Sequence, residues 1–207
     1  MNAVTEVKTK PDAAVTDKTT ARALTPSASP PFKFPIGYYD LHPDISINFQ
    51  VNRFYNGVGD DSMLTEMRET LGGVKDATDY PMFTRLVLDL GEKALARHEM
   101  LKGAYYLRLA EFFMFTEDAR KLPTRQRFVD LILDHFQIPS SAYNRLSFES
   151  GWLPAYRLTP AQPEGTLVVF GGFDSYIEEW LPAALFFRDA GYDTIIFEGP
   201  GQGAALD

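Results

Sequence analysis

Two apolar runs close to the carboxyl end of the chain, each followed by a glycine cluster, constrain the fold more than any other feature. Thr166 to Phe170 and Asp193 to Phe197 are continuous apolar runs of strand length, typical of strands buried in a parallel sheet. The segment between them, Ser175 to Ala190, has helical character and stops at Gly191. This order of strand, helix and strand predicts a βαβ unit, and therefore a fold of the α/β class.

The two glycine clusters follow these runs directly. Gly171-Gly172 follows the first run, and Gly199-Pro200-Gly201-Gln202-Gly203 follows the second. Because parallel strands end at the same edge of a sheet, both clusters are expected where ligands bind in open α/β sheets. A dinucleotide fingerprint is an alternative for the second cluster, but Leu206 stands where G-x-G-x-x-G needs its third small residue.

A β-hairpin is expected before the βαβ unit. Arg145 to Glu149 and Trp152 to Leu158 are short runs of β type on either side of Ser150-Gly151, a dipeptide suited to a two-residue turn. Pro154 has no N–H for a ladder hydrogen bond. We therefore expect the second run near a sheet edge or at a bulge.

Residues 48–136 have the pattern of helices. Between Met82 and Arg97 apolar side chains recur every three or four residues, which predicts an amphipathic helix. Met100 to Phe115 is apolar on all sides and is expected to be buried within a bundle. A third helix is predicted to begin at Thr124 and to end at Ile138-Pro139. A helical bundle should therefore precede the sheet.

Composition and charge exclude several classes of function. The chain has 28 acidic and 20 basic side chains, a net charge of −8, and no basic patch, which disfavours nucleic acid and anionic membrane surfaces as partners. It has no cysteine and only three histidines, His42, His98 and His135, so thiolate chemistry is excluded and little material remains for a metal centre. We expect no metal and no cofactor.

The amino-terminal segment differs in composition from the rest. Residues 1–31 contain no aromatic side chain and consist mostly of Ala, Thr, Pro and Ser, which predicts a disordered tail. The segment lacks the apolar region of a secretory signal, and the sequence has no apolar stretch long enough to span a membrane. A soluble cytoplasmic protein is expected.

These features together resemble the α/β-hydrolase superfamily. The residues that carry the resemblance are Gly171-Gly172-Phe173-Asp174-Ser175 after one strand and Glu198-Gly199-Pro200-Gly201-Gln202-Gly203 after the next. The chain is most similar to the branch that holds the fermentation-respiration switch esterase, fungal pigment polyketide hydrolases and the 2,6-dihydroxypseudooxynicotine hydrolase. The resemblance implies a helical, lid-like domain at residues 32–140, followed at 141–207 by the first strands of an α/β-hydrolase sheet.

The resemblance also implies a site in the loop after Phe170. The backbone N–H of Phe173 would donate to the oxyanion of a tetrahedral intermediate, while Gly171 and Gly172 would let the main chain approach the substrate. A plain glycine turn between strand and helix is the alternative. Asp174 would either bind a substrate hydroxyl or help a proton move, or it would cap the following helix. Both roles stay open.

Other nucleophile and base candidates are less well placed. Ser175 begins an S-x-x-E pattern, which predicts a helix cap, and no G-x-S-x-G surrounds it. Pro182 marks a kink or a fresh helix start within the following segment. His135 lies on the apolar stripe of its helix and is interpreted as a packed residue, and neither of the other two histidines is well placed for catalysis.

The catalytic triad is missing from the sequence. In this superfamily the nucleophile elbow, the acid and the histidine follow the fourth strand in that order, and none of the three occurs in the 207 residues. By resemblance the chain is the truncated front part of a hydrolase and is inactive alone. The run Thr166 to Phe170 would then lie at a sheet edge, because the strand that pairs with it is absent.

Two functions remain open. The first is hydrolysis of an ester or a C–C bond in a small substrate, for which an aromatic compound is one candidate, by the complete enzyme. The second is a non-catalytic helical module for binding or dimerisation. Homodimerisation through the helical domain is suggested by the resemblance alone.

Overall fold

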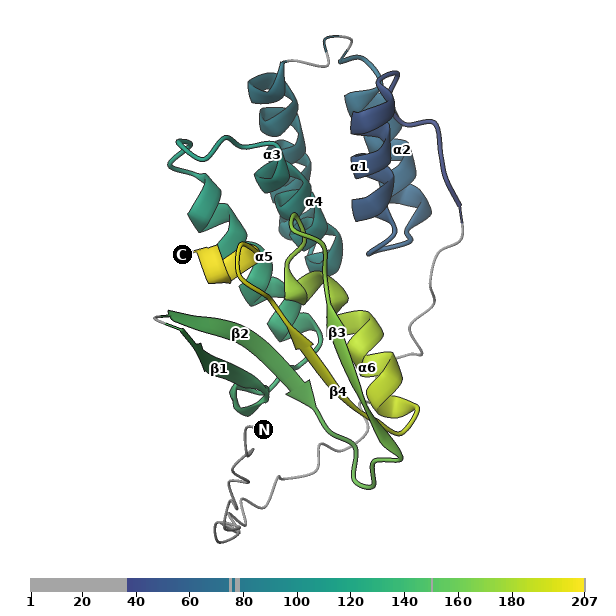
Figure 1. Cartoon of the computed structure of the whole chain (residues 1–207). Helices are drawn as coiled ribbons and strands as arrows, with labels where there is room; N and C mark the ends of the chain where they lie inside the picture. Colours follow the sequence, from purple (N-terminus) through teal and green to yellow (C-terminus); the bar gives the residue numbers. More distant parts are fainter. Residues whose placement is uncertain (1–36, 75, 77–78, 150, 207) are drawn as a thin grey trace, which may run out of the picture.

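The computed structural model describes residues 37–74, 76, 79–149 and 151–206, and the predicted tail at 1–31 lies outside them (Figure 1). The described part begins with helices that stand above a small sheet. The helices before the sheet are α1 Ile45–Tyr55, α2 Asp61–Leu71, α3 Tyr80–Ala96, α4 Met100–Phe112 and α5 Lys121–His135. None of the described helices is both long and apolar enough to cross a membrane.

Aspartate side chains start the first three helices. Asp44 accepts a hydrogen bond from the Ile47 N–H at the start of α1. Asp60 and Asp79 do the same for α2 and α3. An acceptor at this position satisfies one of the N–H groups that a helix leaves unpaired at its start and also interacts favourably with the helix dipole.

Helix α4 is the centre of the helical part, as its all-round apolar pattern predicted. It packs between α3 and α5 and contacts α1. Tyr106, Leu107, Leu109 and Ala110 are fully buried. The predicted helix at Met82 to Arg97 is confirmed as most of α3. The third predicted helix starts earlier than expected, because Pro123 lies inside the first turn of α5, where its missing N–H costs no hydrogen bond.

The sheet has four strands in the order β1-β2-β4-β3. The strands are β1 Tyr143–Phe148, β2 Gly151–Leu158, β3 Gly165–Phe170 and β4 Tyr192–Phe197. Strands β3 and β4 are parallel, with Val168 opposite Ile195, and the remaining pairs are antiparallel. The predicted βαβ unit is therefore confirmed, and both glycine clusters lie at the carboxyl ends of their strands.

The helix between β3 and β4 begins at the proline that the sequence marked. A 3₁₀ turn, Ile177–Trp180, comes first, and α6, Leu181–Asp189, starts with Pro182 in its first turn. Helix α6 then packs against β4. The predicted helical segment Ser175 to Ala190 is thus two pieces, since Pro182 favours a fresh helix start.

Two details of the predicted hairpin were wrong. Phe148 pairs with Gly151, so Gly151 is the first residue of β2 and not part of the turn. Strand β2 lies between β1 and β4, so it is not at an edge. Pro154 is tolerated there because it lies one residue outside the β2–β4 register, which begins at Ala155. Its carbonyl accepts a hydrogen bond from Glu198 N–H, just past the end of β4.

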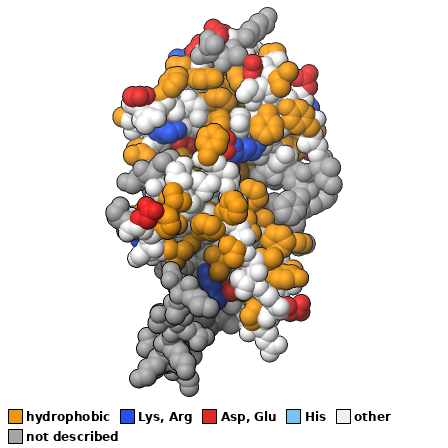
Figure 2. Space-filling model, in the orientation of Figure 1, with side chains coloured by type: hydrophobic (Ala, Val, Ile, Leu, Met, Phe, Trp, Pro, Cys, Tyr) orange, Lys and Arg blue, Asp and Glu red, His pale blue; other side chains and the backbone are white. Residues whose placement is uncertain are grey.

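Strand β3 is an edge strand of the described sheet, and one face of the sheet is open. Alternate side chains of β3 point to that face, and Val168 and Phe170 are 59% and 67% exposed. No described helix lies in front of β3 and β4 in the view of Figure 1, and in the same view hydrophobic side chains gather over the strands (Figure 2). The predicted position of this strand at a sheet edge is confirmed.

Candidate functional site

The two glycine clusters meet beneath the helices at the carboxyl ends of β3 and β4. Gln202 joins them, because its amide nitrogen donates to the Gly171 carbonyl over 2.8 Å while its amide oxygen accepts from Gly199 N–H over 2.7 Å. The loop after β3, residues 171–176, is therefore fastened to the turn after β4. This loop holds every residue that the sequence singled out as a site.

Gly171 is required by the packing of the loop. A Cβ atom at this position would overlap the Ser175 hydroxyl and lie 3.0 Å from the Trp180 indole nitrogen. At Gly172 the nearest side-chain atom would lie 3.6 Å away, so there is room for a small side chain. Phe173 comes next, and its ring is 82% exposed. Among the described residues no hydrogen bond uses the Phe173 N–H.

Ser175 is not the helix cap that the sequence predicted. Its hydroxyl donates to the Gly172 carbonyl over 3.0 Å, which tightens the loop. The carboxylate that turns back to the start of the 3₁₀ turn belongs to Glu179, which accepts from Tyr176 N–H. The capping interaction therefore lies one residue later than the S-x-x-E pattern predicted, because Glu178 accepts a hydrogen bond from Tyr156 instead.

Asp174 faces the helices and does not cap the following turn. Its carboxylate accepts from Arg53 of α1 over 3.0 Å. Its carbonyl accepts from Arg53 over 3.2 Å and from Arg108 of α4 over 2.7 Å. The residue therefore binds the loop to two helices of the bundle.

Arg108 is the centre of this contact, and its guanidinium is almost completely buried, at 1% exposure. Besides the Asp174 carbonyl it donates to Glu179 over 2.7 Å and to Glu111, one turn further along α4. The Tyr176 ring lies 4.0 Å from the guanidinium carbon, and the Tyr176 hydroxyl donates to Glu111. Each of the three guanidinium nitrogens of Arg108 thus donates to an acceptor, and an aromatic ring lies against the group.

We name this group the Arg108 cluster. Its charged members are Arg53, Arg108, Lys121, Glu111, Asp174 and Glu179. Three cations face three carboxylates, so the formal charges cancel. Burial alone lowers the pKa of Arg108, but the carboxylates of Glu179 and Glu111 outweigh burial and hold the pKa above its usual value. The guanidinium is therefore charged at any ordinary pH.

The sequence reasoning missed the Arg108 cluster. Helix α4 was expected to be buried because it is apolar on all sides, yet it carries Arg108 and Glu111 three residues apart near its carboxyl end. Charged side chains in a helix that must be buried need partners, so this pair was a usable signal. The partners from the segment after β3, Asp174 and Glu179, lie more than sixty residues after Arg108 in the sequence and could not be assigned from it.

A second buried carboxyl pair lies beside the 3₁₀ turn. Glu178 accepts a hydrogen bond from the Tyr156 hydroxyl over 3.1 Å. Glu198, after β4, accepts from Ile177 N–H and Ala204 N–H. Gly203, at φ +40°, passes so close to Glu198 that a Cβ would overlap the carboxylate. Burial, and after it the Glu198 carboxylate, raise the pKa of Glu178 to about 7.

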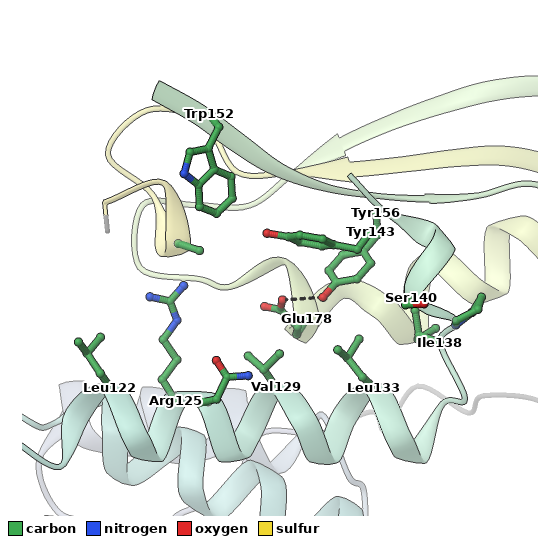
Figure 3. A pocket seen from close by; sticks show the side chains of 13 residues that line it. Leu122, Arg125, Val129, Leu133, Ile138, Ser140, Tyr143, Trp152, Tyr156 and Glu178 are labelled. Atoms are coloured by element: carbon green, nitrogen blue, oxygen red, sulfur yellow. Dashed lines mark hydrogen bonds between the residues drawn. The ribbon is translucent and has the colours of Figure 1, made fainter. Parts of the chain in front are cut away.

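Three cavities flank these groups, and the one of about 480 Å³ is lined by Arg53, Gly172 and Trp180. The remaining two bear on the proposals below. One, of about 530 Å³, opens beside the loop after β3 and is lined by Phe173, Asp174 and Tyr176 with Arg108 and Glu111. The other, of about 560 Å³, lies between α5 and the β1–β2 hairpin, and we name it the α5–hairpin cavity (Figure 3). Glu178 lines the α5–hairpin cavity, and Leu122 and Arg125 line both this cavity and the one beside the loop.

Neither the histidines nor any acidic cluster forms a metal site within the described residues. His42 is buried, and its Nδ1 accepts from Asp44 N–H. His98 takes φ 60° in the turn between α3 and α4. His135 is on the exposed side of α5, so its predicted place on the apolar stripe was wrong.

The sequence is related to fungal hydrolases over part of its length. Over 131 residues it is 34% identical to hydrolyase poxO of Penicillium oxalicum, and over 131 residues 31% identical to alpha/beta hydrolase psoB of Aspergillus fumigatus. These alignments cover 58% and 56% of this chain but 31% and 29% of the two relatives. The chain thus spans about a third of the length of the curated relatives it matches. No family model matches the chain.

The architecture agrees with this relationship. The solved structure of AbyA5 wild type superposes with a TM-score of 0.55 at 19% sequence identity, covering 75% of this chain and 45% of that protein. The chain therefore has part of an α/β-hydrolase fold, with helices before a mixed sheet. Together with the two fungal relatives, this supports the predicted relationship to α/β hydrolases.

Removing the Arg108 side chain should strongly destabilise the chain. In Arg108→Ala the carboxylates of Glu111 and Glu179 stay buried with one cation fewer, and breaking a buried pair in this way costs about 3–5 kcal/mol of unfolding free energy. Arg127→Ala breaks an exposed pair with Glu92 and should cost less than about 1 kcal/mol. Urea unfolding of both variants measures the difference, and equal costs would contradict the role given to Arg108.

Glu178 should make stability fall as the pH rises. Because its pKa is raised to about 7 in the folded state, its contribution is fully present below about pH 4.5 and is lost as the pH rises through 7. Between pH 4.5 and 8 the loss should approach about 3 kcal/mol. Glu178→Gln cannot ionise, so its stability relative to the parent chain should rise over that range. Urea unfolding at several pH values checks this, and a constant difference between the two chains would refute it.

Proposed function

We propose that this chain supplies the oxyanion side and the lid of an α/β hydrolase that cleaves an ester or a C–C bond in a small molecule. The observation that carries the proposal is the loop after β3. It leaves a parallel strand through Gly171, turns back under the helices, and has in Phe173 an N–H with no partner among the described residues. The partial sequence relationship to fungal hydrolases supports the same function.

In the proposed reaction a nucleophile attacks the carbonyl carbon of the substrate, and the carbonyl oxygen becomes an oxyanion. The Phe173 N–H donates to this oxygen, and such a donor typically lowers the barrier by about 3–4 kcal/mol. The pattern G-x-S-x-G does not occur in the sequence. The proposed reaction therefore requires a nucleophile that is not supplied by a nucleophile elbow within these 207 residues.

Asp174 has a different proposed role from the one considered first. Its carboxylate is held by Arg53, and its carbonyl is held by Arg53 and Arg108. A group held in this way fixes the backbone directly after Phe173. We propose that Asp174 is a positioning residue for the oxyanion donor and does not transfer a proton.

The helical part has the proposed role of a lid. Phe112 and Thr116, at and after the end of α4, line the same cavity as Phe173. Leu122, near the start of α5, lines it too and is 60% exposed. A substrate next to Phe173 would therefore be covered by apolar groups from two helices, which strengthens the interaction of the oxyanion with its donor by excluding water.

The test uses the gene product that includes the coding sequence after Asp207, assayed with 4-nitrophenyl acetate. Phe173→Pro removes the backbone N–H, and kcat should fall by about 100- to 1000-fold. Phe173→Ala keeps the N–H and is the matched control, which should keep most of the activity. Equal losses in the two variants would rule out a backbone donor at this position. If no G-x-S-x-G followed Asp207, the hydrolase proposal would give way to a non-catalytic binding module.

A further inference from the structure

The α5–hairpin cavity lies along a second apolar stripe of α5, which is less buried than the stripe that faces α4. Phe128 and Ile132 are fully buried, and Phe128 meets the Tyr105 ring of α4 at 5.9 Å between centroids. Leu122, Val129 and Leu133 form a second stripe. Figure 3 shows these three side chains pointing from α5 into the cavity.

Aromatic rings form the opposite wall. Tyr143, Trp152 and Tyr156 from β1 and β2 line the cavity across from α5 (Figure 3). Tyr143 and Tyr156 contact one another at 5.2 Å between ring centroids, and Arg145 lies 3.7 Å over the Trp152 ring. These contacts hold the rings in place. The space between an aliphatic and an aromatic wall suits a flat, apolar group, and its volume of about 560 Å³ is typical of small-molecule sites.

The cavity also has a carboxyl group. Glu178 is 7% exposed, and the Tyr156 hydroxyl donates to one of its two oxygens. The titratable groups around it are Glu198 after β4, Tyr156 of β2, Tyr143 of β1 and Arg125 of α5. Of these only Arg125 is a cation, and it shares the neighbourhood with two carboxyl groups. A ligand with a positive charge would stabilise Glu178 in its ionised form.

We propose that the α5–hairpin cavity binds a small planar aromatic cation, with its ring between α5 and the hairpin rings and its charged group hydrogen bonded to Glu178. The Glu178 carboxyl group and the aromatic rings of the hairpin favour the same ligand, because aromatic faces attract cations as well as flat apolar groups. Phe173 and Asp174 do not line this cavity. The proposal therefore goes beyond the proposed hydrolase function and does not depend on it.

The charge of Glu178 sets the expected pH dependence. Burial and the Glu198 carboxylate raise its pKa to about 7, so the group is neutral below this pH and ionised above it. A cation should therefore bind more tightly at pH 8 than at pH 5.5. A neutral ligand of the same shape should show little change.

The test is calorimetric titration of the 207-residue chain with benzamidine, a planar aromatic cation, and with benzamide, its neutral isostere. At pH 8 benzamidine should bind at least about tenfold more tightly, as expected for one charge-assisted hydrogen bond. At pH 5.5 the two affinities should approach one another. Equal affinities at pH 8, or no measurable binding of benzamidine, would overturn the proposal.

Three variants locate the binding. Glu178→Gln keeps the shape of the side chain and should remove the preference for benzamidine, whereas Glu92→Gln, which removes an exposed carboxylate of α3, should leave it unchanged. Val129→Phe fills the cavity from α5 and should weaken both ligands. If benzamidine kept its preference in Glu178→Gln, or kept its affinity in Val129→Phe, it would be bound elsewhere and the proposal would be wrong. Thermal melts of each variant confirm that it is folded.

Discussion

The buried guanidinium of Arg108 joins the two parts of the molecule. It is carried by α4, at the centre of the helices, and its acceptors Asp174 and Glu179 lie in the segment after β3. A charge removed from water is tolerated only when its partners are in place. The packing of the helices and the conformation of the loop are therefore conditional on one another. The Phe173 side chain stays exposed in this loop, and its backbone is the proposed donor.

The carboxyl groups near this loop fall into two kinds. Glu111 and Glu179 contact cations directly, within a cluster whose charges cancel. Glu178 is next to Glu179 in sequence but lies across the 3₁₀ turn, where the Glu198 carboxylate helps to raise its pKa. Two neighbouring residues thus differ in role: Glu179 belongs to a structural ion pair, and Glu178 is a carboxyl group with a raised pKa. The second kind is the one expected at a binding site, because strongly shifted pKa values cluster at functional sites.

The sequence predicted the parts of the fold that depend on local patterns. Apolar runs and glycine clusters predicted the parallel pair of β3 and β4, helical periodicity predicted α3, and a segment that is apolar on all sides predicted α4. The details that failed depend on register or on distant partners. Pro154 fits an inner strand because it lies just outside the β2–β4 register. Ser175 is not a helix cap, because the Glu179 carboxylate accepts the hydrogen bond from Tyr176 N–H at the start of the 3₁₀ turn. The contact of Arg108 with the loop joins residues that are 66 positions apart, which no local pattern reveals.

Hydrogen exchange of the loop amides tests the coupling between helices and loop most directly. Ser175 N–H donates to Gly172 and Tyr176 N–H donates to Glu179, so both report on the loop conformation. In Arg108→Lys, which keeps the charge but not the planar fork, these two amides should exchange faster, while the β4 amide of Ile196 keeps its protection. Unchanged protection at Ser175 and Tyr176 in a folded Arg108→Lys chain would contradict the account.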